Sequence, residues 1–144
     1  MTVTAQNVAR ILGGNRTFGK RIVTVADLRR AVEGGLPVTA LDQVVSYVIG
    51  TGPGAAELRH SIVPKTTLRR RLRLSAEESE RLERLARMTA LAEQVWESAD
   101  LAHEFLTSPQ PQLGDERPID LARSDLGTRE VEEVLMRIEY SLPV

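Results

Sequence analysis

The chain of 144 residues contains no cysteine and few aromatic side chains: one tryptophan, two tyrosines and two phenylalanines. Without cysteine, the protein can form no disulfide bond, no thiolate metal site and no cysteine nucleophile. Because aromatic residues are scarce, leucine, valine, isoleucine and alanine must fill most of the core, a composition that suits packed helices. The length predicts one folding unit, with room for two small subdomains that share a core.

Long apolar runs are also missing. No segment approaches the roughly 20 apolar residues that a membrane-spanning helix needs. The first residues, MTVTAQNVARILGG, lack both the basic start and the long apolar stretch of a secretion signal. We therefore expect a soluble, cytoplasmic protein that does not bind membranes.

Residues typical of catalytic and metal sites are scarce as well. His60 and His103 are the only histidines, so a zinc site would need carboxylates to complete it. Residues 14–20 have the Gly-x4-Gly-Lys spacing of a phosphate-binding loop, but Arg21 stands where that motif requires a hydroxyl, and a β-α-β context is missing. No nucleophile elbow is present. We expect a binding protein that is not an enzyme, with no catalytic residue, metal or cofactor.

The net charge of -1 conceals two halves of opposite sign. Residues 1–73 hold 12 lysines and arginines against 4 acidic residues, a net of +8, whereas residues 74–144 hold 7 against 16, a net of -9. The stretch VPKTTLRRRLR, residues 63–73, contributes five of these cations and no acid. This asymmetry indicates a basic half that binds polyanions and an acidic half that binds a different partner.

The spacing of apolar residues predicts an all-α fold. Thr24 can cap a helix that Gly34 and Gly35 end, and Ser75 and Glu78 form a capping box that opens a long helix to about Trp96. For residues 40–49 a strand competes with the helix, because four β-branched residues lie there. Loops are expected over 13–24, 50–54 and 107–116, and further helices over 7–12, 55–61, 64–73, 99–106, 118–123 and 128–140.

Residues 63–73 are the best candidate for a binding site. On a helix that begins at Pro64, Lys65, Arg69 and Arg73 would share one face, while Leu68 and Leu72 would anchor the other face to the core. Together with the short segment before it, this pattern predicts a helix-turn-helix whose second helix enters the major groove. The candidate DNA contacts, to bases or phosphates, are Lys65, Thr66, Thr67, Arg69, Arg70 and Arg73.

Two other interpretations of this segment remain open. It could be a basic face that serves only solubility. It could also be a membrane-surface helix, but that needs more large apolar residues than Leu68, Leu72 and Leu74 provide.

Several points along the chain resemble the Xre/MbcA/ParS-type antitoxins that neutralise RES-domain toxins. They are Pro64-x-x-Thr67-Leu68-x-Arg70-Arg71, the LSAEES start at residues 74–79, RPIDL at 117–121, Gly127 and RIEY at 137–140. The resemblance covers residues 11–142. It implies an N-terminal Xre-like helix-turn-helix domain, residues 1–73, that binds operator DNA, and a C-terminal helical domain, residues 74–144, that binds and inhibits an NAD-consuming toxin.

The resemblance also implies where the toxin binds. We expect the end of the last helix and the chain terminus to block the toxin's NAD site, with exposed glutamates (Glu130, Glu132, Glu133 and Glu139) facing its electropositive pocket. For Arg117 the competing interpretation is an internal ion pair with Asp120, and Trp96 is expected in the core. The candidate toxin contacts are Arg117, Glu139, Tyr140, Ser141, Leu142, Pro143 and Val144.

The expected assembly is a homodimer within a hetero-oligomeric toxin–antitoxin complex that represses its own operon. Two other classes of function fit the same charges. One is a stand-alone helix-turn-helix transcriptional regulator whose acidic domain only dimerises, and the other is an adaptor whose basic face binds protein instead of DNA.

Overall fold

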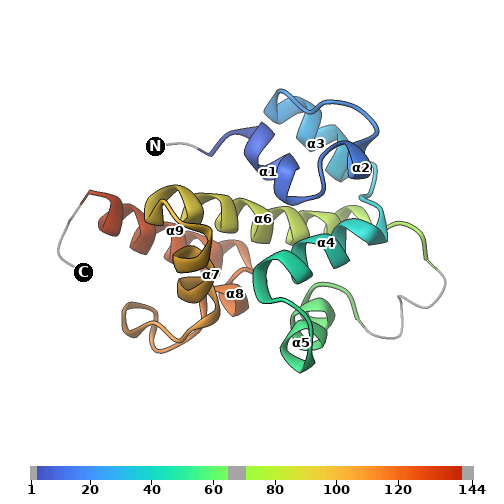
Figure 1. Cartoon of the computed structure of the whole chain (residues 1–144). Coiled ribbons are helices and arrows are strands. Elements are labelled where there is room, and N and C mark those ends of the chain that lie inside the picture. The colour runs from blue at the N-terminus through green and yellow to red at the C-terminus, as the bar shows by residue number, and fades with distance from the viewer. Residues whose placement is uncertain (1–2, 65–70, 141–144) are drawn as a thin grey trace.

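The computed structural model describes residues 3–64 and 71–140, and its regular structure there is helical, as predicted. One long helix, α6 (Ala76–Trp96), runs through the middle of the molecule (Figure 1). At about 1.5 Å per residue it is about 30 Å long. On one side of it lie α1 (Ala5–Ile11), α2 (Asn15–Phe18) and α3 (Val25–Glu33).

The remaining helices cover the other sides of α6. α4 (Val38–Ile49) and α5 (Pro53–Ile62) lie toward its beginning, and α7 (Ala99–Thr107), α8 (Pro118–Leu121) and α9 (Asp125–Glu139) lie toward its end (Figure 1). A short 3-10 helix, η2 (Pro111–Leu113), lies in the stretch between α7 and α8. α6 contacts α1, α3, α4, α5, α7 and α9, so the basic and acidic halves of the chain are packed on the same helix.

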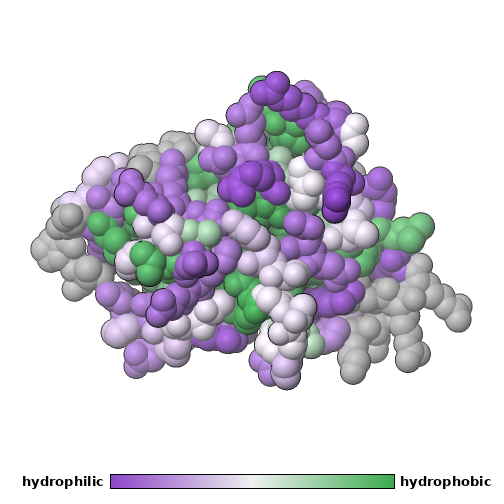
Figure 2. Space-filling view, in the orientation of Figure 1, coloured by the Kyte–Doolittle hydropathy of each residue, from purple (hydrophilic) through white to green (hydrophobic). Residues whose placement is uncertain are grey.

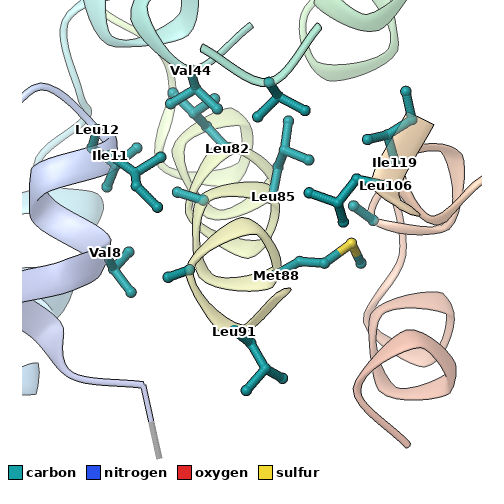
Figure 3. Packing of buried hydrophobic residues seen from close by; sticks show 14 of the residues in the cluster. Val8, Ile11, Leu12, Val44, Leu82, Leu85, Met88, Leu91, Leu106 and Ile119 are labelled. Atoms are coloured by element: carbon teal, nitrogen blue, oxygen red, sulfur yellow. The ribbon is translucent and has the colours of Figure 1, made fainter. Parts of the chain in front are cut away.

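The core forms around α6 because its buried side chains point in several directions (Figure 3). Leu82 points toward Val44 of α4, and Met88 points toward the helices that carry Leu106 and Ile119. Almost no surface of these five side chains is exposed: Val44, Leu82, Met88, Leu106 and Ile119. Burying an aliphatic side chain of this size contributes about 1.5–3 kcal/mol. From the N-terminal part of the chain, α1 contributes Val8 and Ile11, and Leu12 follows directly after it.

Both predicted helix caps are confirmed. The Oγ1 of Thr24 accepts a hydrogen bond from the N–H of Asp27 at 3.0 Å, which begins α3. The Oγ of Ser75 accepts from the N–H of Glu78 at 3.0 Å, and the Glu78 carboxylate accepts from the N–H of Ser75 at 2.8 Å. These capping boxes satisfy N–H groups that the first turn of a helix leaves unpaired.

Most predicted helices are confirmed, with shifted ends. Residues 40–49 are helical, as α4, and not a strand. α5 begins at Pro53, inside the predicted loop, because a proline suits the first turn of a helix, where its missing N–H costs nothing. α9 begins three residues earlier than predicted, at Asp125, where Ser124 caps it. The one-turn α2 was not predicted.

The helix predicted to run from Pro64 to Arg73 is wrong at its C-terminal end. Arg73 pairs with Pro37 in an antiparallel β-bridge, and the N–H of Leu74 donates to the carbonyl of Leu36 at 2.8 Å. Leu72, which was expected to anchor the helix to the core, is 85% exposed, whereas Leu74 is 3% exposed. The chain leaves the helical path here, so the helical spacing that would place Leu68 and Leu72 on one buried face does not apply to Leu72.

The rest of that predicted helix, residues 65–70, lies outside the described residues and stays a prediction. Within the described ranges, no helix has both the length and the apolar character that crossing a bilayer requires.

Candidate functional site

The basic segment, residues 63–73, is held by the core on its N-terminal side. Ile62 ends α5 and is buried, and Val63 after it is fully buried. Arg81 of α6 donates from its Nη1 to the carbonyl of Ile62 at 2.9 Å and pairs with Glu77 at 3.0 Å. A cation that hydrogen-bonds the last carbonyls of a helix stabilises that end. The point at which the segment leaves α5 is therefore fixed.

On its C-terminal side the segment is tied to the first turn of α6. The guanidinium of Arg71 donates two hydrogen bonds to the carboxylate of Glu78, one of them at 3.1 Å. These bonds raise the pKa of Arg71 and are the main cause that lowers the pKa of Glu78 below its ordinary value. Two parallel hydrogen bonds from one guanidinium to one carboxylate are among the strongest interactions that arginine forms. Arg71 is thus engaged within the fold.

Arg73 is the one candidate DNA contact that the structure places. Its Nη1 donates to the carbonyl of Gly35 at 2.7 Å, while much of the residue remains exposed. Gly35 has a φ of +86°, and a Cβ there would lie 2.5 Å from the carbonyl oxygen of Leu74. Glycine is needed at this position because the two backbones approach so closely. The other candidates, Lys65, Thr66, Thr67, Arg69 and Arg70, lie outside the described residues.

At the acidic end, Arg117 forms an internal ion pair with Asp120, the alternative to a toxin contact. Its Nε donates to Asp120 at 2.9 Å and its Nη2 donates to the same carboxylate at 3.2 Å. Glu139 is half-buried, and Tyr140 is 57% exposed at the end of α9. Ser141, Leu142, Pro143 and Val144 lie outside the described residues, so the predicted contacts of the terminus stay predictions.

The solvent-facing side of α9 is acidic. The helix carries five acidic residues and two arginines. Glu130 and Glu133 are exposed, whereas Glu132 and Glu139 are half-buried. The exposed end of α9 and the beginning of α6, next to the basic segment, lie at opposite ends of the molecule (Figure 1). The end of α9 and the beginning of α6 are therefore far from each other.

Comparison with known protein families matches both halves of the chain. The antitoxin Xre-like helix-turn-helix domain matches residues 27–87, and the antitoxin Xre/MbcA/ParS C-terminal toxin-binding domain matches residues 91–140. The chain belongs to the Xre/MbcA/ParS family of antitoxins. It is also similar to a Pseudomonas putida protein named Antitoxin Xre, with 36% identity over 84 residues, which is 56% of this chain and 53% of that protein. The chain spans about half the length of this curated relative.

The helix-turn-helix match of this Xre/MbcA/ParS antitoxin contains most of α3, all of α4 and α5, and the basic segment. Its boundary with the toxin-binding match falls inside α6, between residues 87 and 91. The predicted division after residue 73 stays a prediction. A helix shared by both matches means that the two regions cannot move apart without breaking the core around α6.

Gly127, one of the points of family resemblance, has a steric role in this antitoxin. A Cβ at this position would lie 2.2 Å from the carbonyl oxygen of Leu121 and 2.9 Å from the Oγ of Ser124. The absence of a side chain therefore lets the first turn of α9 pack against α8. Trp96, expected in the core, is half-buried and lies 5.9 Å from Phe105 between ring centroids.

A polar cluster that was not predicted from the sequence joins the two halves of the antitoxin. The carboxylate of Glu93 on α6 accepts a hydrogen bond from the hydroxyl of Tyr47 on α4 and lies 2.9 Å from the Nε2 of His103 on α7. Arg10 of α1 adds an ion pair at 3.4 Å. Burial raises the pKa of Tyr47 above its ordinary value. These four residues are far apart in the sequence, so no local pattern could have grouped them.

Proposed function

We propose that this protein is an antitoxin that binds and inhibits a RES-domain, NAD-consuming toxin through its C-terminal region and represses its own operon by binding operator DNA. The observation that carries the proposal is the order of the two family matches, a helix-turn-helix before a toxin-binding domain, on a chain whose halves have net charges of +8 and -9. Binding to an operator places its action in the cytoplasm.

The basic segment supports the DNA-binding part of the proposal. The described residues on either side of 65–70 are anchored, since Val63 is fully buried and Arg71 pairs with Glu78. The side chains proposed to contact the operator are Lys65, Thr66, Thr67, Arg69, Arg70 and, at the C-terminal end of the basic segment, Arg73. A dimer, alone or within the toxin complex, would place two such segments on two half-sites and multiply weak contacts.

Gel-shift titrations at increasing salt test this part. Replacing Arg69 and Arg70 with alanine should weaken operator binding and flatten its salt dependence, because each phosphate contact releases condensed counterions. Operator binding that is insensitive to salt, or unchanged in this variant, would refute the phosphate contacts.

The acidic helices support the toxin-binding part. The toxin must hold the pyrophosphate of NAD in an electropositive pocket, and α9 presents acidic side chains near Tyr140 and the chain terminus. Complementary charge speeds encounter and sets the register of two proteins. We propose that the end of α9 and residues 141–144 occlude the mouth of the NAD site.

The proposal predicts a RES-domain gene beside this one, and co-expression with the toxin that it encodes tests the whole function. The antitoxin should restore growth and cellular NAD, and the two proteins should purify as a complex. A stand-alone regulator would have no RES-domain gene beside it and would rescue neither quantity, although it would still bind DNA.

A further inference from the structure

A basic groove lies between α1 and the chain that follows it, residues 14–22, on the side of α6 opposite to α5. We call it the α1–α2 groove. Its polar lining consists of three cations and three side-chain amides: Arg10, Lys20, Arg21, Gln6, Asn7 and Asn15. No acidic residue is among the described residues that line it. Hydrophilic residues predominate on the visible face over α1 and α2, with some hydrophobic residues among them (Figure 2).

The two cations at the outer edge of this groove are available to a ligand. Lys20 and Arg21 are exposed, and neither forms an ion pair with any residue in the described ranges. Arg10 is partly neutralised by Glu93, at 3.4 Å. Asp27 is close enough to Lys20 for a weak electrostatic effect, but its carboxylate accepts hydrogen bonds from the N–H groups of Val23 and Thr24.

The neighbouring arginines of α3 provide a contrast. Arg29 pairs with Glu33 at 2.6 Å, and Arg30 pairs with Asp27 at 3.6 Å. These two cations are exposed like Lys20 and Arg21, but each already has an acidic partner on its own helix. Among the described residues from α1 to α3, the cations with no ion pair to another described residue are Arg16, Lys20 and Arg21, and the last two line the groove.

The backbone holds this part of the groove in place. α2 is a single turn between Gly14 and Gly19, and both glycines have positive φ, at +60° and +66°. Lys20 and Arg21 then precede Ile22, which is buried in the core. The two cations are thus fixed by a tight turn on one side and a buried anchor on the other. This stretch is the one whose glycine and lysine spacing resembles a phosphate-binding loop without its hydroxyl or its β-α-β context.

We propose that the α1–α2 groove binds the phosphodiester backbone of DNA, in addition to the DNA contacts proposed for residues 65–70. This inference rests on the proposed DNA-binding function. Lysine, arginine, asparagine and glutamine are the side chains that contact phosphates in protein–DNA interfaces, where they position the protein without reading sequence. A duplex presents one negative charge about every 1.7 Å of its axis, so a groove with two free cations and three amides, and no acid, fits it.

The salt dependence of operator binding tests the groove. The variant Lys20→Gln with Arg21→Gln removes two cations, and the matched control, Arg29→Gln with Arg30→Gln, changes the net charge by the same amount. Since each phosphate contact contributes about -0.9 to the slope of log K against log salt, the groove variant should lower the magnitude of the slope by about 1.8. The control should change it much less, and neither variant should change which sequence is preferred.

Equal changes in both variants would show only a general effect of net charge and would overturn the proposal. A slope unchanged in the groove variant would overturn it as well. If the groove variant instead bound DNA normally but lost affinity for the toxin, the groove would be a protein-binding surface, and the proposal would be wrong.

A second measurement separates failure of the groove from failure of the operator function. Amide chemical shifts of the full chain are recorded during titration with a short duplex of unrelated sequence. Shifts should appear at Gln6, Asn7, Lys20 and Arg21 in the wild type and persist after Arg69→Ala with Arg70→Ala. Their absence overturns the groove even if the operator is bound, and their presence supports the groove even if the wild type shows no preference for an operator.

Discussion

Arg71 and Glu78 join the end of the basic segment to the first turn of α6 through a pair of hydrogen bonds that share one carboxylate. Glu78 also completes the capping box of α6, so a single buried carboxylate serves both the helix start and the segment. This arrangement explains why the second arginine of the Arg70-Arg71 pair is engaged within the protein. It also predicts that Glu78, which is not a proposed DNA contact, influences the position of the basic segment.

The first prediction concerns this ion pair. Arg71→Ala, Glu78→Ala and the double variant should each lower the midpoint of thermal unfolding, and the double variant should cost less than the sum of the single ones. Each single change leaves a partner without its hydrogen bonds, whereas the double change removes both. Thermal unfolding followed by circular dichroism measures this, with Arg30→Ala as a control in an exposed pair. Additive losses would show that the two residues do not stabilise each other.

The second prediction concerns pH. The pKa of Glu78 lies below its ordinary value of 4.5 in the folded protein, mainly because of Arg71. A carboxyl whose folded pKa is lowered contributes stability above its unfolded pKa and loses it as the pH falls through the folded pKa. The stability difference between wild type and Glu78→Gln should therefore be largest above pH 4.5 and shrink in more acidic solution. Urea unfolding across this pH range checks it, and a difference that grows on acidification would contradict the assigned pair.

The third prediction concerns the close approach at Gly35. Gly35→Ala combines a left-handed backbone conformation, worth about 1–3 kcal/mol in strain, with a clash against the carbonyl of Leu74. Gly50→Ala is a matched control, because Gly50 also has a positive φ but a Cβ there meets nothing within 4 Å. Chemical unfolding should show a larger loss for Gly35→Ala. Equal losses would mean that the strand-like pairing of residues 36–38 with 72–74 is not tight.

The fourth prediction concerns the chain terminus. Deleting residues 141–144 should release NAD consumption by the toxin, even where the two proteins still form a complex. The prediction follows from the proposed occlusion of the NAD site by the end of α9 and the terminus. NAD turnover by the purified complex measures it, together with a pull-down that verifies binding. Full inhibition by the shortened protein would show that the terminus is not the blocking element.

Local sequence signals predicted much of this fold. The capping residues Thr24 and Ser75 marked the starts of α3 and α6 because the bonds that they form reach only three residues along the chain. The stripe of apolar residues in residues 40–49 also predicted α4 correctly, although β-branched residues favoured a strand there. Packing against α6 decided between the two, since α4 contacts α6.

Features set by distant partners could not be predicted in this way. Leu72 was expected in the core because it continues a helical stripe, but the pairing of residues 72–74 with 36–38 turns it to the solvent. The role of Arg71 depends on Glu78, and the end of α5 depends on Arg81, which lies 19 residues beyond Ile62. The sequence indicated that the segment is basic, but only the fold shows which of its arginines is already engaged.

We propose that DNA and toxin can be held at once, because the segment proposed to bind the operator precedes α6 and the proposed toxin contacts lie at the end of α9. The most direct measurement is the mass of the complex, by sedimentation velocity, when labelled operator duplex and the RES-domain toxin are both in excess over the antitoxin. We expect a single species that contains all three components. Release of the duplex as the toxin binds, with no ternary species at any ratio, would contradict the claim.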